Sequence, residues 1–442
     1  MKDIKDIYKA LLYSILCGVI ALSIGYISAR MDILIIFLTF ALILSFVLTK
    51  HYELPMALLF NGLFVYFYVV YKAGFNTNSL LTGGFYGMLA FTSIVGGMKY
   101  FKEIRVTMVD ILMTVYFVLY YLSFLMFSSD NPGSIQKMTL FPLLVITPYY
   151  SMRLLSKTEN IRRFFVFVII VTALLIVPSL LELIFNPIHA HSSRFSLYKF
   201  ENVPDNPILF GITFAILIVI LGIRTIETKK NIYINLVAII ISLFLLLRSG
   251  SRGAVASLAA CIIFYLLFLS KIKLKSKILY ISIFSLFSIL IVYILPSQVT
   301  DFYAYTFSDE AQISEASSVY QRITMWDQAT NEFLQNPVTG VGMGNSVGGS
   351  GFPHNIILEI LAEFGIIGFV FLVLLLNIVI RHAFIVSKGS NKNALYMRIA
   401  LVLFIYNSIE GLFSGFLGNQ TTIYMGIGMI ESLYVINKGR NE

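Results

Sequence analysis

The chain has 442 residues, of which 58% are hydrophobic and 12% are charged, and its formal net charge is +9. Soluble domains carry about 25% charged residues, so this composition excludes an ordinary soluble protein and indicates one that crosses a membrane many times. The positive charge is then an orientation signal for the loops and not a sign of nucleic-acid binding. Both cysteines, Cys17 and Cys261, lie in apolar runs and suggest no disulfide framework.

Apolar runs of about 20 residues, the length that crosses a bilayer as a helix, recur along the whole chain. Helices are expected because backbone groups in lipid need hydrogen-bond partners within their own segment. The sequence therefore predicts an all-α polytopic membrane protein with about 14 transmembrane helices. The predicted spans lie near 11–29, 33–49, 55–72, 80–98, 107–127, 138–153, 164–184, 207–223, 231–247, 253–270, 278–295, 355–380, 394–413 and 418–436. Among them, 80–98 is rich in glycine and 138–153 contains two prolines, so either could be broken or re-entrant.

Basic residues are distributed unevenly among the connections. If the N-terminus is placed in the cytoplasm, the inside loops contain KYFKEIR, KTENIRR, RTIETKK and KIKLKSK, and the outside connections contain few cations. This follows the positive-inside rule and predicts that both termini are cytoplasmic, with an even number of spans between them. The N-terminal MKDIKDIYK leads into one span of many and is not expected to be a cleaved signal peptide.

Two outside connections are long, and loops beyond about 15 residues are usually functional or disordered. The second contains SVYQRITMWDQATNEFLQ (318–335), which predicts a short amphipathic helix on the outer membrane surface or folded back over the spans. The glycine-rich stretch after this helix can fold tightly against a ligand or simply flex. The resulting division is a membrane region 1–184, a loop 185–206, a membrane region 207–295, a long extracytoplasmic loop 296–354 and a membrane region 355–442.

Few cations are predicted on the outer side, and two of them share one short connection. Arg248 and Arg252 lie between two apolar runs in LLLRSGSRGAVASLAA, separated by Ser-Gly-Ser. One interpretation is an ordinary loop whose arginines reach to the interface. The other is a fork for a pair of phosphate oxygens, held near the membrane by the tight turn.

Four further residues on this side have two interpretations each. Arg322 lies on the predicted amphipathic helix and is either a solvated residue of that helix or a ligand for an anion. Arg194 lies in the loop 185–206 and is either a solvated loop residue or a second contact of this kind. His354 and Asn355 open the span FPHNIILEILAEFGIIGFVFLV and either cap its helix or serve a reaction at the lipid boundary.

Together, these cations and the histidine suggest an anionic ligand whose apolar part lies in the bilayer, and a lipid pyrophosphate fits this description. Arginines supply charge and fixed donors for phosphates and stabilise a departing pyrophosphate. A histidine, with a pKa near 6.5, can be neutral and accept a proton from a sugar hydroxyl. The outward acids are scattered without an Asp-x-Asp pair, so no metal or other cofactor is expected.

Three stretches in this order resemble the O-antigen ligase and polymerase superfamily of bacterial membrane glycosyltransferases. SGSRGAVASLAA is similar to the family's Ser-Arg-Gly opening of a span, and QRITMWDQATNEFLQNPVTGVGMGN resembles its arginine-bearing helix followed by Pro-x-x-Gly-x-Gly. PHNIILEILAEFGIIG is similar to its His-Asn-x-x-Leu segment with Gly365 beyond it. The resemblance covers about residues 230–375, and the N-terminal half matches only as a run of helices.

The resemblance implies a GT-C-like fold and metal-independent transfer of a glycan from undecaprenyl pyrophosphate on the outer side of the bacterial cytoplasmic membrane. By position, Arg252 and Arg322 would engage the pyrophosphate, and His354 would act as the base or orient the acceptor. Arg194, Arg248 and Asn355 are further substrate-binding candidates, of which Arg248 has no clear counterpart in the family. The implied partners are the lipid-linked glycan donor, a glycan or lipid A-core acceptor and the bilayer, with a chain-length regulator as a further candidate.

Two enzymes and one transporter remain as alternatives. A polymerase joins one lipid-linked repeat unit to another and is preferred, whereas a ligase moves the finished chain to lipid A-core or to a protein. A transporter of lipid-linked sugars would place its charges in the middle of spans, often in repeated halves. Charges are expected to be nearly absent from the spans here, with Glu182 and Glu410 as exceptions near the outward ends.

Overall fold

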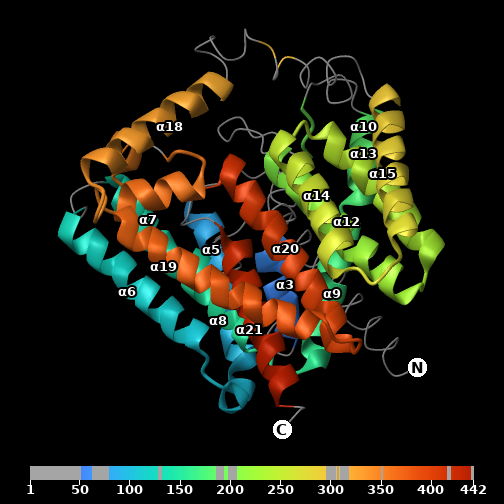
Figure 1. The fold of residues 1–442 in the computed structure, drawn as a ribbon, viewed down its shortest axis with the longest axis horizontal. Helices are drawn as coiled ribbons and strands as arrows, with labels where there is room; N and C mark the ends of the chain where they lie inside the picture. The colour runs from blue at the N-terminus through green and yellow to red at the C-terminus, as the bar shows by residue number, and fades with distance from the viewer. Residues whose placement is uncertain are drawn as a thin grey trace, which may run out of the picture.

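The computed structural model describes residues 51–61, 79–127, 132–185, 194–197, 207–294, 305, 308, 318–349, 352–415 and 420–439. Every regular element in this part of the chain is a helix, and no strand occurs in it (Figure 1). The all-helical prediction is therefore confirmed for these residues. The predicted spans 11–29 and 33–49 lie outside them.

The helices follow one another in an order close to that of the predicted spans. In chain order they are α3 (Glu53–Asn61), α5 (Ser79–Gly97), η1 (Met98–Glu103), α6 (Met108–Phe127), α7 (Pro132–Phe141), η2 (Pro142–Ile146), α8 (Thr147–Arg153), α9 (Thr158–Ala173), α10 (Ile176–Phe185), α12 (Pro207–Thr228), α13 (Ile232–Arg248), α14 (Arg252–Phe264), η3 (Tyr265–Leu269), α15 (Leu274–Ile294), α18 (Ser318–Gln335), η4 (Ser346–Gly349), α19 (Ile356–Ser387), α20 (Lys392–Ser414) and α21 (Thr421–Lys438).

Six helical stretches among the described residues are long and apolar enough to cross a membrane, which indicates an integral membrane protein. They are Met108–Phe127, Thr158–Phe185, Pro207–Thr228, Arg252–Leu269, Ile356–Ser387 and Lys392–Ser414. The predicted total of about 14 spans is not confirmed by this count, which covers only the described part of the chain.

The proline-containing run at 138–153 is helical but not regular. Pro142 opens a five-residue π turn, η2, between α7 and α8, and the N–H of Thr147 closes this turn on the carbonyl of Pro142. Proline lacks the N–H of a regular turn and its ring crowds the preceding turn, so a wider turn accommodates it. The helix also begins at Pro132, earlier than predicted.

The core of the bundle is formed by α12 and α20. In each of these two helices, 67% of an apolar stretch of 18 residues is buried inside the protein, compared with 22% of such a stretch in α19. α20 packs against α12, α14, α19 and α21, whereas α19 crosses the bundle with much of its apolar surface outward. The outward side chains of α19 are those that lipid would cover.

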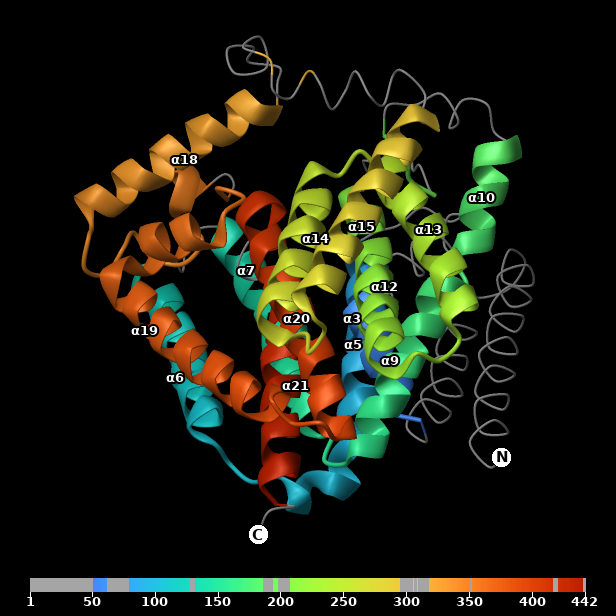
Figure 2. The same cartoon turned by 45° about the vertical axis from the view of Figure 1, so that its right-hand side comes forward.

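The two ends of the bundle carry different elements. α18 lies across one end, and η1 lies at the other, beside the last turn of α21 (Figures 1 and 2). Buried polar contacts join helices near the η1 end. Arg398 on α20 donates to Glu227 on α12 at 2.8 Å, and Tyr265 donates to the same carboxylate at 2.9 Å. Since α20 begins near this end, its last residue, Ser414, lies toward α18.

Candidate functional site

α18 is held against the start of α19. It covers the predicted residues 318–335, and its indole donor, Trp326 Nε1, lies 2.8 Å from the carbonyl oxygen of Pro353. Ala329 is buried in the contact between the two helices. The amphipathic helix therefore folds back over the spans (Figure 2). Its contact with Pro353 brings it next to His354.

His354 has an unusual backbone and a half-buried ring. Its φ is +53°, a conformation that residues other than glycine rarely adopt and that is often found at functional sites. The centre of its ring lies 4.6 Å from the centre of the Phe352 ring, in an edge-to-face arrangement. Its Nδ1 is buried without a hydrogen-bond partner among the described residues. Burial lowers the pKa of His354, the charge of Arg322 lowers it further, and a hydrogen bond with the backbone of Ser414 opposes both. The imidazole is therefore neutral at pH 7 and able to accept a proton.

Asn355 is the N-cap of α19. Its side-chain oxygen accepts hydrogen bonds from the backbone N–H groups of Ile357 at 3.0 Å and Leu358 at 3.2 Å. These bonds satisfy two of the N–H groups that a helix leaves open at its start. The capping interpretation of Asn355 is thus correct, and its substrate-binding role stays a prediction that would rely on its amide nitrogen.

Arg322 and Glu410 face each other beside His354. Arg322 is half-buried on α18, and burial lowers its pKa, whereas the charge of Glu410 opposes this effect. Glu410 lies on α20, one helical turn before Ser414, and only 3% of its surface is exposed. Its Oε1 has no hydrogen-bond partner among the described residues. Arg322, His354 and the end of α20 therefore form one polar group.

Arg252 joins this group from α14. It is the first residue of that helix, and its Nη2 donates to the hydroxyl of Ser318 at 3.2 Å. Ser318 and Arg322 are four residues apart on α18 and so lie on the same face. The neighbouring Gly253 lies against α20, because a Cβ there would be 3.3 Å from Ser414 Oγ. The three predicted catalytic residues are thus brought together at the end of α20.

Arg194 and Arg248 form a second group. Arg248 ends α13, is only 1% exposed, and holds its guanidinium 6.0 Å from the ring centre of Phe195. The N–H of Phe195 donates to the carbonyl of Arg248 at 3.1 Å, which brings the adjacent Arg194 beside the Ser-Gly-Ser turn. An arginine that reaches to the interface is therefore the wrong interpretation for Arg248, since the protein surrounds its side chain.

The glycine-rich stretch after α18 is docked on a break in α19. Gly365 has φ +61°, which interrupts the helix and exposes backbone groups. The carbonyl of Ala362 accepts from Val341 N at 2.8 Å, and the carbonyl of Pro337 accepts from Ile366 N at 2.8 Å. A Cβ at Gly340 would lie 2.4 Å from the backbone of α19, so only glycine permits this approach. Free flexing is therefore the wrong interpretation for residues 337–342, whereas folding against a ligand stays a prediction.

A family described as O-antigen ligase matches residues 237–373, a segment that contains Arg248, Arg252, Arg322 and His354. This part of the chain matches the O-antigen ligase and polymerase superfamily that the sequence resembles. This confirms the predicted resemblance. A match to this family implies a glycosyltransferase-like enzyme of O-antigen assembly that acts on a lipid-linked glycan in a membrane. No curated protein matches the chain.

The protein also contains a buried charge cluster that was not predicted from the sequence. Lys137 on α7 donates to Glu359 at 2.9 Å and to Glu363 at 2.6 Å, and the hydroxyl of Ser346 donates to Glu363 at 2.8 Å. Both carboxylates are fully buried on α19. The prediction that charges are nearly absent from the spans is therefore wrong for α19. The spacing of four between the two glutamates, which puts them on one helix face, was the available signal.

Replacing Lys137 by methionine should destabilise the protein by about 3–5 kcal/mol, because two buried carboxylates would lose their cation. The measurement is equilibrium unfolding in mixed micelles, with Lys388→Met as the control because Lys388 is exposed. Adding Glu359→Gln and Glu363→Gln to Lys137→Met should recover part of the loss. A change below about 1 kcal/mol for Lys137→Met, the range of a surface pair, would contradict a structural role for the cluster.

Proposed function

We propose that this protein is a polymerase of a surface polysaccharide. It transfers a glycan from undecaprenyl pyrophosphate to the sugar hydroxyl of a second lipid-linked repeat unit. The observation that carries this proposal is the meeting of Arg252, Arg322 and neutral His354 at the end of α20. Two cations and one base are what a displacement from a pyrophosphate requires.

In the proposed reaction, the bond between the anomeric carbon and the pyrophosphate oxygen breaks, and a bond from that carbon to the acceptor oxygen forms. The electron pair leaves with the pyrophosphate, whose charge Arg252 and Arg322 balance. The hydroxyl proton passes to the imidazole of His354. Direct displacement inverts the anomeric carbon. Because arginines supply the positive charge, turnover should continue in the presence of a chelator.

The remaining predicted residues have supporting roles in this proposal. Arg194 lies beside the Ser-Gly-Ser turn that precedes Arg252, where it would contact the donor from a second side. Arg248 would keep this turn in place through Phe195, and Asn355 would fix the start of α19 and hence His354. We further propose a GT-C-like arrangement in the bacterial cytoplasmic membrane, with α18 on the outer side and both termini in the cytoplasm, as the basic inner loops indicate.

A ligase is the second candidate, and the description of the matching family favours it. The polymerase is preferred because genes for such enzymes are numerous and divergent, which fits a chain whose N-terminal half resembles the family only as a run of helices. A deletion of the gene separates the two. Cells that lack a polymerase should carry a single repeat unit on the lipid A-core, whereas cells that lack a ligase should accumulate long chains on the polyprenyl carrier.

The transporter alternative rests on the charges within α19, which are of the kind that transporters use in their spans. Here the two carboxylates are paired with Lys137 and covered by protein. Reconstituted protein distinguishes these activities, because a transporter moves the lipid-linked glycan unchanged and a polymerase lengthens it. Movement across the bilayer without lengthening would exclude the proposed function.

A further inference from the structure

A cluster of lysines lies where α15 and α20 begin, at the end of the bundle opposite α18. The Nζ of Lys271, just before α15, donates to the carbonyl oxygen of Gly389, just before α20, at 3.1 Å. The cluster, which we call the lysine surface, comprises Lys271, Lys273, Lys275, Lys277 and Lys392. It is remote from Arg252, Arg322 and His354, so the proposed reaction does not explain it.

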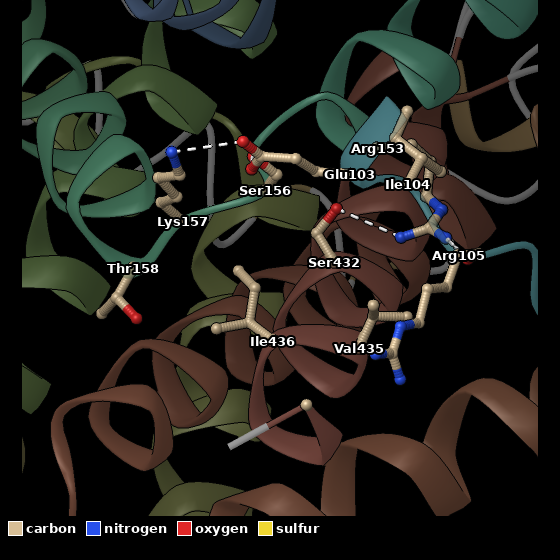
Figure 3. A pocket seen from close by; sticks show the side chains of 11 residues that line it. Glu103, Ile104, Arg105, Arg153, Ser156, Lys157, Thr158, Ser432, Val435 and Ile436 are labelled. Atoms are coloured by element: carbon tan, nitrogen blue, oxygen red, sulfur yellow. Dashed lines mark hydrogen bonds and ion pairs between the residues drawn. The ribbon is translucent and has the colours of Figure 1, made fainter. Parts of the chain in front are cut away.

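The charge of the lysine surface is not balanced by acids. Elsewhere at this end of the bundle cations are paired, as with Lys157, whose Nζ lies 3.2 Å from a carboxylate oxygen of Glu103 (Figure 3). In contrast, no lysine of the lysine surface forms an ion pair with a described residue. The stretches 266–280 and 386–395 also contain no Asp or Glu. Positive charge is therefore concentrated on one part of this end.

The lysines occupy helix positions where acids are usually preferred. α15 begins at Leu274 and α20 at Lys392, and neither helix has an acidic residue in its first turn. The start of a helix carries partial positive charge and open N–H groups, so a cation there is unfavourable and an anion is favourable. Lys275 and Lys392 lie in these two first turns and are exposed. These positions do not serve helix stability, but they suit the binding of an anion.

The two helix starts are held together by polar contacts of the main chain. The carbonyl oxygen of Gly389 accepts from Lys271 at 3.1 Å and from Nη1 of Arg398 at 3.2 Å. The Nζ of Lys277 donates to the carbonyl oxygen of Leu267, before the turn into α15, at 3.3 Å. The lysine surface is therefore a defined part of the fold.

Apolar side chains are exposed directly beside the lysines. Phe268 is 66% exposed, Leu274 67% and Ile278 57%. Leu274 and Ile278 are four residues apart and so lie on one face of α15. Apolar groups next to a row of cations match the boundary between acyl chains and anionic headgroups.

We propose that the lysine surface binds the headgroup of an anionic phospholipid in the leaflet that is predicted to be cytoplasmic. The lysine ammonium groups and the N-termini of α15 and α20 face the lipid phosphate, and the acyl chains lie along Leu274 and Ile278. The exposed apolar side chains are the reason to assign a lipid and not a soluble anion or an acidic protein. This binding does not depend on the proposed transfer reaction.

The test uses the full chain purified in a mild neutral detergent. Native mass spectrometry measures the binding of phosphatidylglycerol, phosphatidylcholine, sn-glycerol 1-phosphate and a poly-glutamate peptide, added in turn. Phosphatidylglycerol should bind about tenfold more tightly than phosphatidylcholine, and Lys275→Gln with Lys392→Gln should weaken its binding about 30-fold. Lys99→Gln with Lys102→Gln removes two exposed cations of η1 at the same end and should leave binding unchanged.

The Lys275 and Lys392 variant should fold normally, because each substitution removes a cation from the first turn of a helix. Its midpoint of thermal unfolding in neutral detergent should therefore not fall below that of the wild type. Added phosphatidylglycerol should raise the midpoint of the wild type more than that of the variant. An equal rise in both proteins would contradict the site.

Three binding results would overturn the proposal. Glycerol phosphate or poly-glutamate binding as tightly as the lipid would assign a soluble partner, and equal binding of phosphatidylcholine would remove the charge requirement. An equal loss in the Lys99 and Lys102 variant would mean a general charge effect. A further measurement needs no variant: phosphatidylglycerol, and not phosphatidylcholine, should slow amide hydrogen exchange over residues 271–278 in nanodiscs. Unchanged exchange there would also contradict the site.

Discussion

Arg322→Ala should lower the rate of glycan transfer by about 10²–10³-fold, the usual cost of removing one donor that stabilises a developing anion. Arg322 lies beside His354 and Glu410, and Arg252 reaches the same face of α18 through Ser318. The measurement is chain elongation by reconstituted protein with a purified lipid-linked donor. Arg252→Ala should have a similar effect. Arg381→Ala, an exposed arginine near the other end of α19, should turn over normally.

The loss in Arg322→Ala has two separable causes. One is the lost contact with the pyrophosphate, and the other is the buried carboxylate of Glu410, which would no longer face a cation. The double variant Arg322→Ala with Glu410→Gln removes the second cause. Its activity should stay as low as that of Arg322→Ala. Recovery to within about threefold of the wild-type rate would show that Arg322 only balances the charge of Glu410. It would exclude the proposed role of Arg322 in stabilising the departing pyrophosphate, which is expected to contribute roughly 10²-fold.

His354→Ala should lower turnover by about 10²–10⁴-fold, the contribution of a positioned general base. Burial and Arg322 lower the pKa of His354 below its ordinary 6.5, so the free protein keeps the neutral imidazole to a lower pH than a solvated histidine would. The kcat/KM of the wild type should therefore fall only as the pH drops below about 6.5. A bound pyrophosphate adds negative charge nearby and raises this pKa, so the acid limb of kcat should lie at higher pH than that of kcat/KM.

Two controls make the assignment of His354 as a base specific. Added imidazole should restore part of the activity of His354→Ala and leave the wild type unchanged. The pH profile of the variant should lose its acid limb, which a purely structural role would not remove. If His354→Ala retained both normal turnover and the normal acid limb, the imidazole would take no part in proton transfer.

Local pattern in the sequence was enough to predict the all-helical class and to find three residues that the structure brings together, whose roles stay a prediction. The alternation of apolar and polar residues in 318–335 gave α18 with both ends correct, since this pattern is set within one helix. The motifs around Arg252, Arg322 and His354 were sufficient to relate this part of the chain to one family. None of this required knowledge of which helices are neighbours.

Contacts between distant segments could not be predicted in this way. Lys137 meets Glu359 and Glu363 across more than 200 positions, and no local period links α7 to α19. The docking of the Pro-x-x-Gly-x-Gly stretch depends on the break at Gly365, which looks like one more glycine in an apolar run. Arg248 looked like a boundary cation because the loop residue that covers it, Phe195, comes from another connection.

The hydrogen bonds between residues 337–342 and the break in α19 have a consequence for the release of the product polysaccharide from the candidate site. Arg322 and His354 lie at the two ends of the segment 322–354, whose middle is hydrogen-bonded to α19. The two residues are therefore expected to move together as one rigid unit. Arg252 lies on α14, outside this unit, and its hydrogen bond to Ser318 is one contact that joins the two parts. In the proposed mechanism, opening for a bulky saccharide would separate Arg252 from Arg322 and His354, and the same movement would release the pyrophosphate carrier.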